Sequence, residues 1–280
     1  MSSALFFRRQ PVLPGFTLSF GLSVLFVSAV ILVPLTALPL YLSGLGWAEY
    51  WQLITDPRVL ASYQVTLKAA ALAAVANALI GLLLAWVLVR YRFPGRRLMD
   101  ALVDLPFALP TAVAGITLTT LFASNGWLGQ WFHRFDIQIT YAVPGLVLAM
   151  AFTSLPFVVR ALQPVLEDLS VDYEDAARTL GANRAKSFLY VVLPHLRPAL
   201  ITGTALAFIR SLGEFGAVIF IAGNIPFETE VTSLMIFVRL QEYDYEAAAA
   251  VASVVLATSL LLLIAVQRLQ HHYLKRLQGN

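Results

Sequence analysis

The 280-residue chain contains no cysteine, only four histidines and few charged residues, which make up 12% of the sequence. The absence of cysteine excludes disulfides, thiolate nucleophiles and cysteine-ligated zinc. A charged fraction this far below the ~25% of ordinary soluble domains argues against a water-soluble globular protein. The net charge of +3 is small, and the chain lacks the basic patch of a nucleic-acid-binding protein. We therefore expect no nucleic-acid partner.

Sequence motifs of catalysis are missing as well. No Gly-x-x-x-x-Gly-Lys-Ser/Thr loop is present, so the chain is not expected to bind ATP through a P-loop. The sequence contains neither a His-Glu-x-x-His zinc motif nor a Gly-x-Ser-x-Gly nucleophile motif. We expect a chain that is not an enzyme by itself, with no catalytic residue, no metal site and no cofactor of its own.

Apolar residues dominate the sequence and account for 59% of it. They gather into long stretches, and ~20 apolar residues suffice for a helix to cross the hydrocarbon core of a bilayer. The predicted spans are 16–41, 62–89, 99–123, 141–163, 198–222 and 245–267. The first is too long for the apolar region of a signal peptide, so we interpret it as a retained span. The sequence predicts an all-α, polytopic membrane helix bundle of six transmembrane spans, formed by residues 1–280 as a single domain in the lipid bilayer.

Basic residues are concentrated in alternate breaks between the predicted spans. Arg8 and Arg9 precede the first span, further arginines lie between the second and third, and others lie in the break at 163–197. The positive-inside rule places such breaks on the cytoplasmic side. Both termini and the long break at 163–197 are therefore predicted to be cytoplasmic.

A short amphipathic helix is predicted within the break at 163–197. Asp172 is a candidate N-cap, with Asp175 three residues later as in a capping box. Gly181 stands where a left-handed residue commonly ends a helix. Asn183 is placed to cap a second helix, which Pro194 is expected to end or bend. Residues at i, i+3, i+4 and i+7 give the first helix one apolar face: Tyr173, Ala176, Ala177 and Leu180.

Two turns of helix are not stable alone in water, so this segment must pack on something. One interpretation is a helix that lies on the membrane surface or on its own bundle. The other is a helix that inserts into a groove of a cytoplasmic partner. The small side chains of Ala176 and Ala177 allow close backbone approach in either case.

Residues 175–194 resemble the EAA motif of ABC-importer permeases, which reads Glu-Ala-Ala, three residues, Gly, nine residues and Ile-x-Leu-Pro. Asp175 replaces the glutamate and Val191 replaces the isoleucine. The matching positions are Ala176, Ala177, Gly181, Leu193 and Pro194. Residues 90–95, 104–111 and 211–217 are similar to the sulfate/molybdate branch of these permeases, and most similar to its sulfate/thiosulfate permeases.

This resemblance implies a type I ABC-importer permease fold and the transport of sulfate or thiosulfate across the bacterial inner membrane. It implies a companion related permease subunit, two copies of an ATP-binding subunit that use ATP and Mg²⁺, and a periplasmic sulfate/thiosulfate-binding protein. The residues it implies for coupling to the ATPase are Tyr173, Asp175, Ala176, Ala177, Leu180, Gly181, Leu193 and Pro194.

Two alternatives to this function are open. A permease for another oxyanion, such as molybdate, has the same motifs. A proton-coupled secondary transporter with Glu214 as its titrating group belongs to another class. The cytoplasmic helix favours the importer, because a secondary transporter does not need one.

Arg210 and Glu214 are ionisable residues within the predicted fifth span. They are four residues apart and hence neighbours on one helix face. A charge at mid-bilayer costs ~2.5–3.5 kcal/mol on insertion scales, so such residues face the bundle interior or a water-filled cavity. Either they form a self-neutralising pair that positions the helix, or they belong to a translocation pathway or gate. Pro106 and Pro110 in the third span are similarly either packing kinks or pathway-lining bends.

Overall fold

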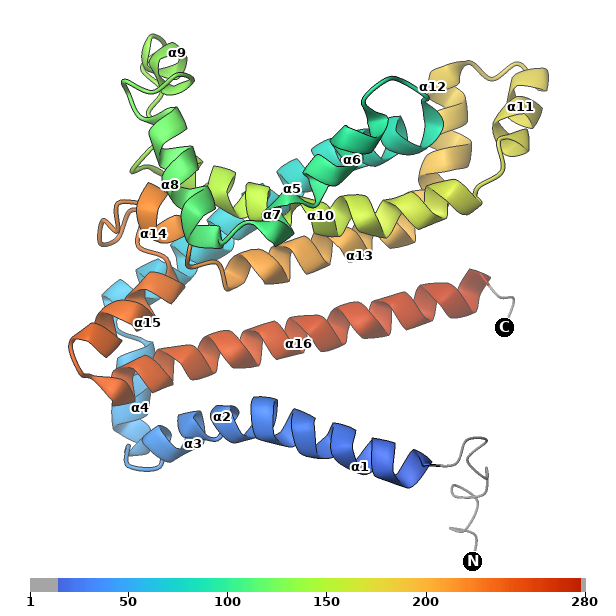
Figure 1. The fold of residues 1–280 in the computed structure, drawn as a ribbon. Coiled ribbons are helices and arrows are strands. Elements are labelled where there is room, and N and C mark those ends of the chain that lie inside the picture. Colours follow the sequence, from blue (N-terminus) through green and yellow to red (C-terminus); the bar gives the residue numbers. More distant parts are fainter. Residues whose placement is uncertain (1–14, 278–280) are drawn as a thin grey trace, which may run out of the picture.

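Residues 15–277 are described by the computed structural model, and in that range the regular structure is helical throughout, with no strand (Figure 1). The all-α prediction is confirmed for this range. Five of its helical stretches are long and apolar enough to cross a membrane: Phe16–Leu42, Pro57–Arg90, Val143–Asp168, Arg184–Leu212 and Tyr245–Arg268. Residues 1–14, which include Arg8 and Arg9, and residues 278–280 lie outside the described residues.

Three long helices form the centre of the bundle: α5 (Pro57–Arg90), α10 (Val143–Asp168) and α13 (Leu193–Leu212), each packed against the other two. α5 begins earlier than predicted because the Asp56 carboxylate caps it, accepting hydrogen bonds from the N–H groups of Arg58 (2.9 Å) and Val59 (3.4 Å). Small buried residues, such as Ala69, Ala70 and Ala73 of α5, line the contact. They let the helix backbones approach closely, as is typical of membrane bundles.

The first and last long helices lie beside this centre (Figure 1). The first is made of α1 (Phe16–Val27), η1 (Ser28–Leu32), α2 (Val33–Leu35) and α3 (Ala37–Leu42), and none of its residues is buried. α16 (Tyr245–Leu277) packs against α13, α3 and the short helix α4 (Trp47–Ile54). Because the first helix is apolar and almost uncovered, its surface is suited to lipid or to another subunit.

Two π-helical turns each precede a proline. η1 is followed by Pro34, and η2 (Phe188–Val192) is followed by Pro194. A proline ring clashes with the carbonyl four residues earlier, and a widened π turn accommodates it without breaking the helix. The helical stretch runs on from Arg184 to Leu212, so Pro194 does not end it. The predicted bend is seen in Figure 1, where α13 runs in a different direction from α12 (Arg184–Ser187).

The third predicted span, 99–123, is not one helix. It consists of α6 (Arg96–Val103), α7 (Leu105–Ala108) and α8 (Thr111–Phe122). The second interruption lies at Leu109, whose backbone is extended because the following Pro110 disfavours the α conformation. In Figure 1, α8 and the short α9 (Gly129–His133) project at an angle from the central helices. Pro110 thus accounts for the second break, while the first lies at Asp104, two residues before Pro106.

The fifth predicted span, 198–222, is also interrupted. α13 ends at Leu212, and a short α14 (Val218–Ile221) follows after a five-residue break, so Glu214 lies beyond the helix that the sequence placed it in. A further helix, α15 (Thr232–Gln241), lies between the fifth and sixth predicted spans and was not predicted. Its ten residues are too few for a membrane span, so span length gave no signal for it.

Candidate functional site

The helix predicted from the EAA-like motif is present as α11 (Asp172–Thr179), at one end of the bundle (Figure 1). Its predicted N-cap was wrong by one residue, because Asp172 is already helical and Val171 holds the N-cap position without a side-chain cap. Just before the helix, Ser170 Oγ accepts a hydrogen bond from the Asp172 N–H (3.2 Å) and donates one to Asp172 Oδ2 (2.8 Å). Asp175 does not complete a capping box, and its Oδ1 pairs with Arg178 Nη1 at 3.0 Å.

The end of α11 confirms the predicted left-handed glycine. Gly181 has φ +86°. Its N–H donates to Arg178 O (2.9 Å), and the Ala182 N–H donates to Ala177 O (3.0 Å), which together form a Schellman motif. Asn183 then caps α12 (Arg184–Ser187) by accepting a hydrogen bond from the Lys186 N–H at 2.9 Å, as predicted. This tight turn reverses the chain, so that α11 lies against α12 and η2.

The apolar face of α11 is not covered by the rest of the described chain. Leu180 is 89% exposed and Tyr173 is 55% exposed. Ala176 is exposed and Ala177 is partly buried. The opposite side of the helix faces the bundle, where Glu174 is buried. Most of the predicted face is therefore exposed, and Ala177 is its partly buried member.

The remaining residues predicted for coupling lie elsewhere. Leu193 and Pro194 are partly buried at the junction of η2 and α13, behind α11. The His195 ring next to them lies 5.9 Å from the Tyr173 ring, centroid to centroid. The structure thus brings the two halves of the motif together, with one half exposed and the other supporting it.

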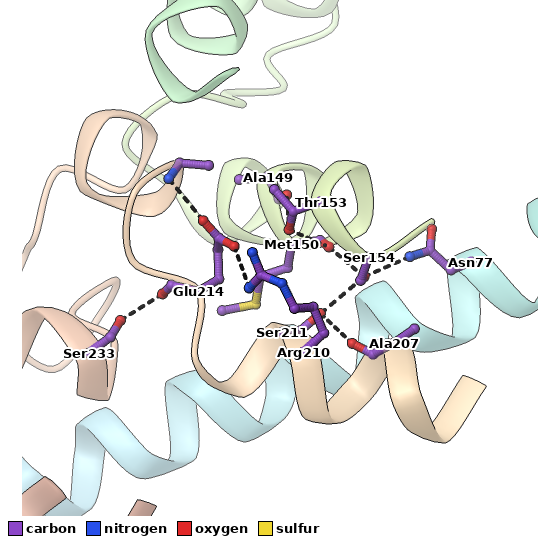
Figure 2. Close-up of polar contacts among 11 residues, drawn as sticks. Asn77, Ala149, Met150, Thr153, Ser154, Ala207, Arg210, Ser211, Glu214 and Ser233 are labelled. Carbon is purple, nitrogen blue, oxygen red and sulfur yellow. Dashed lines mark hydrogen bonds and ion pairs between the residues drawn. The ribbon is translucent and has the colours of Figure 1, made fainter. Parts of the chain in front are cut away.

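Arg210 and Glu214 form an ion pair inside the bundle, with Arg210 Nη1 2.9 Å from Glu214 Oε2 (Figure 2). Glu214 Oε2 accepts no aligned hydrogen bond, so attraction between charges dominates this contact. The other carboxylate oxygen accepts a hydrogen bond from the Ala217 N–H at 3.0 Å. The Glu214 side chain is 1% exposed and that of Arg210 is 34% exposed. The carboxylate is therefore enclosed while the guanidinium reaches the surface of the chain.

Glu214 also ties the break after α13 to α15. The Ser233 hydroxyl at the start of α15 donates to the Glu214 carbonyl oxygen at 2.7 Å (Figure 2). The pair thus lies at the junction of α13, α14 and α15. Sequence reasoning found both charged residues, but it missed this junction because it treated residues 198–222 as one helix.

A buried polar network joins the three central helices beside this pair (Figure 2). Asn77 Nδ2 of α5 donates to Ala151 O (3.0 Å) and to Ser154 Oγ (2.9 Å) of α10. Ser211 Oγ of α13 donates to the same Ser154 Oγ at 3.1 Å. Because every member has partners, the network fixes the relative positions of α5, α10 and α13. The sequence analysis did not single out these residues, since isolated Asn and Ser residues carry no pattern.

Asn77→Ala is expected to loosen this network without stopping transport. Interhelical hydrogen bonds in membranes contribute ~0.6 kcal/mol on average and up to ~1.7 kcal/mol. Because Asn77 donates two of them, we expect a loss of about 1 kcal/mol, seen as a Tm lower by a few degrees in detergent. Uptake in vesicles at moderate temperature should stay within about two-fold of wild type. An unchanged Tm would contradict the structural role of Asn77.

The two interrupted spans meet at their interruptions. A Cβ added to Gly216 would collide with the side chain of Thr111, directly after Pro110. A Cβ added to Gly115 in α8 would likewise collide with the Ala217 backbone. Pro106 is buried and Pro110 is exposed, so only Pro106 lies in the interior. The breaks at Pro110 and at Gly216 are thus neighbours, although about a hundred residues separate them in sequence.

A second cluster of charges fastens α6 to α10. The Arg160 guanidinium of α10 donates to Asp104 Oδ1 (2.8 Å), to Asp100 Oδ1 (2.7 Å) and to the Asp100 carbonyl oxygen (2.9 Å). Gln163 Nε2 adds a hydrogen bond to Asp100 Oδ1 at 2.9 Å. This clamp holds the first short helix of the interrupted span in place. The clamp was not predicted, because its partners come from two different predicted spans.

Long apolar helices, interrupted spans and an exposed EAA-like helix define a membrane-embedded permease of the importer type. The chain belongs to the family of binding-protein-dependent transport system inner membrane components, whose family model matches residues 77–279. The membrane location predicted from composition is thereby confirmed.

Two relatives match almost the whole chain. The sulfate transport system permease protein CysT of Escherichia coli (strain K12) is 62% identical over 269 residues, which cover 96% of this chain and 97% of the relative. The protein of the same name from Salmonella typhimurium is 63% identical with the same coverage. The predicted similarity to the sulfate/thiosulfate permeases is thereby confirmed.

Solved structures share the fold at low sequence identity. A bacterial ABC transporter involved in the import of the acidic polysaccharide alginate matches with a TM-score of 0.73 at 15% identity, over 92% of this chain and 96% of that one. A second structure of an alginate transporter, in complex with a periplasmic protein, matches with a TM-score of 0.73 at 16% identity. At such identities the likeness concerns the fold alone.

Proposed function

We propose that this chain is the permease subunit of an ATP-driven importer that carries sulfate or thiosulfate across the bacterial inner membrane. The family membership supports an importer that depends on a binding protein. The identity above 60% with two sulfate transport permeases, over nearly their full length, supports the cargo. The observation that carries the mechanism is the exposed apolar face of α11, which includes Leu180 at 89% exposure.

The proposed membrane arrangement has six spans within a single domain, residues 1–280, and both termini in the cytoplasm. Five spans are the long apolar helices, and the interrupted segment α6–α8 would provide the sixth. The start of α1 and the end of α16 lie at the same end of the bundle as α11 (Figure 1). This common end supports placing both termini on the side of the docking helix.

The proposed partners are two copies of an ATP-binding subunit, a companion related permease and a periplasmic sulfate/thiosulfate-binding protein. One ATPase subunit would receive α11, so that Tyr173, Ala176, Ala177 and Leu180 fill a groove on it. ATP and Mg²⁺ would be used on those subunits, while this chain supplies no catalytic group. The uncovered apolar surface of the first span supports contact with lipid or with the companion permease.

We assign Arg210 and Glu214 to a gate at the junction of the interrupted spans. Their ion pair, together with the Ser233 hydrogen bond, holds the break after α13 against α15. The neighbouring break at Pro106 and Pro110 allows α8 to move relative to α7, because breaks in a helix act as hinges where rigid elements meet. Arg210 is partly exposed and offers a positive charge to an approaching anion.

ATPase activity of the intact complex tests the proposed cargo. The complex is purified with both permeases and both ATPase copies and reconstituted in nanodiscs. Sulfate, thiosulfate, selenate and molybdate are then each added with the periplasmic binding protein. We expect sulfate and thiosulfate to raise ATP hydrolysis about ten-fold and molybdate to leave it near the basal rate.

Other outcomes redirect the assignment. Stimulation by molybdate alone would replace the sulfate assignment with another oxyanion. Uptake that a proton ionophore abolishes and that continues without ATP would identify a secondary transporter instead. The ATPase measurements use the nanodisc preparation, and uptake is measured after reconstitution of the same purified complex in sealed proteoliposomes.

A further inference from the structure

The buried side of α11 carries a charge that the EAA-like motif does not account for. Glu174 precedes the motif, and its carboxylate Oε1 lies 3.2 Å from Nε of Arg90. The two side chains are only 11% and 14% exposed. Arg90 is the last residue of α5, one of the three central helices. A contact between the ends of α5 and α11 therefore consists of two charges that are largely withdrawn from water.

Arg90 also holds two further elements. Its Nη2 donates a hydrogen bond to the carbonyl oxygen of Leu169, the residue that ends α10, at 2.9 Å. Its guanidinium carbon lies 5.7 Å from the centre of the Trp86 ring, a cation–π distance. The Trp86 ring in turn meets Phe188 of η2 edge to face at 5.1 Å. One side chain thus joins the ends of α5 and α10 to α11 and to the helix that follows it.

The ion pair borders a cavity and not a packed apolar contact. A space of about 560 Å³ lies between α5, α11 and α12, and residues such as Trp86, Arg90, Glu174 and Ser187 line it. α11 packs along α12 and η2, but across the cavity side chains and not backbones connect it to α5. The charged contact is therefore the direct link between α11 and α5, beside the indirect route through η2 and α13.

The exposed pair on the same helix provides a comparison. Arg178 and Asp175 are about half exposed and three residues apart within α11. Such surface pairs contribute little because water screens them and the side chains lose freedom. The Arg90–Glu174 pair is withdrawn from water and joins elements 84 positions apart in sequence, so it connects parts of the fold that the motif helix alone does not.

We propose that Arg90 and Glu174 form a strut that makes α11 and the cytoplasmic ends of α5 and α10 move as one rigid unit. The inference rests on the proposed docking of α11 to an ATPase subunit. When ATP-driven closure displaces α11, the strut carries that displacement to the central helices, and these two residues are positioning residues that touch neither ATP nor the cargo. Without the strut, the ATPase would still bind and turn over, but less of the movement of α11 would reach α5 and α10.

The first test separates coupling from assembly. Glu174→Gln preserves the shape of the side chain and removes its charge. We expect the variant complex to retain its ATPase subunits and its stimulated ATP hydrolysis, while the anions imported per ATP fall about five-fold. Arg92→Gln is the matched control, because Arg92 is an exposed arginine two residues further along with no ion pair among the described residues. An unchanged ratio in Glu174→Gln would overturn the strut.

The second test uses the absence of cysteine from the chain. In a complex whose partners also lack cysteine, Arg90→Cys and Glu174→Cys are combined and joined by a bifunctional methanethiosulfonate with a spacer. Before cross-linking, the double-cysteine variant should import few anions per ATP hydrolysed. Cross-linking should restore at least about half of the wild-type ratio of anions to ATP. Cross-linking that blocks uptake, or that leaves coupling unrestored, would show that α11 and α5 move independently and would overturn the proposal.

Co-purification separates a failure of the strut from a failure of the proposed docking. If α11 does not bind the ATPase, a charge placed on its exposed face leaves the ATPase attached, and the proposed function is at fault. If that charge removes the ATPase but Glu174→Gln and the cross-link behave as wild type, the docking stands and the strut does not.

Discussion

Leu180→Asp is expected to detach the ATP-binding subunits and to reduce uptake to background. Leu180 is 89% exposed at the end of α11 and contacts little of its own chain. Replacing an exposed apolar residue seldom changes folding stability by more than ~0.5 kcal/mol. An aspartate buried in a partner's apolar groove, in contrast, leaves a charge without water, and interface hot spots change binding by ~2 kcal/mol or more. The affinity should fall more than about ten-fold, as measured by co-purification of the ATPase with the permease.

Ile137→Asp is the matched control for this substitution. Ile137 is an exposed aliphatic residue after α9, which lies at the opposite end of the bundle from α11 (Figure 1). It should leave the ATPase attached. A Leu180→Asp complex with its full complement of ATPase would show that the exposed face of α11 is not the docking surface. Size-exclusion profiles of both variants check that each permease remains folded.

Arg210→Ala is expected to have the second large effect. We expect it to reduce uptake by a factor of about ten or more. The substitution leaves the Glu214 carboxylate, 1% exposed, with the Ala217 N–H as its one hydrogen-bond donor and without its counter-charge. Removing one partner of a buried pair costs ~3–5 kcal/mol, and the partial exposure of Arg210 places this pair at or below the lower end of that range. We expect uptake to fall further than the yield of assembled complex.

The asymmetry of the pair predicts the outcome of the companion substitution. Glu214→Gln leaves Arg210, which already reaches the surface and can be hydrated, and its amide oxygen still accepts the Ala217 N–H. It should therefore reduce complex yield less than Arg210→Ala does. The double variant Arg210→Ala with Glu214→Gln removes both charges. If it restores assembly but not uptake, Arg210 acts in the pathway; if it restores both, the pair is structural. Wild-type uptake by Arg210→Ala would contradict either role.

Local patterns predicted α11 and the turn after it well. The spacing of Tyr173 and Leu180 gave the apolar face, Gly181 gave the left-handed end, and Asn183 gave the next cap. All three depend on residues within a few positions of one another. The N-cap was placed at Asp172, whereas the helix begins one residue earlier than that placement requires and Val171 holds the N-cap position, because local patterns do not fix where the first turn begins.

Hydropathy was less informative about helix breaks. Residues 99–123 and 198–222 are apolar enough to be spans, yet both are interrupted, at Asp104 and Leu109 in one case and near Gly213 in the other. A proline does not by itself end a membrane helix, as Pro156 inside α10 shows. Whether the chain breaks depends on partners for the freed backbone groups, and those partners come from distant segments.

The sequence alone determined the membrane class, the all-α fold of the described range and the amphipathic helix α11, because composition and short-range periodicity specify them. Only the tertiary structure revealed which charges meet: Arg90 with Glu174, Arg160 with Asp100 and Asp104, and Glu214 at the junction of α13 and α15. Each of these contacts joins residues that are 19 or more positions apart in the chain. Packing of the long helices decides such contacts, and no local pattern encodes the partner of a single buried charge.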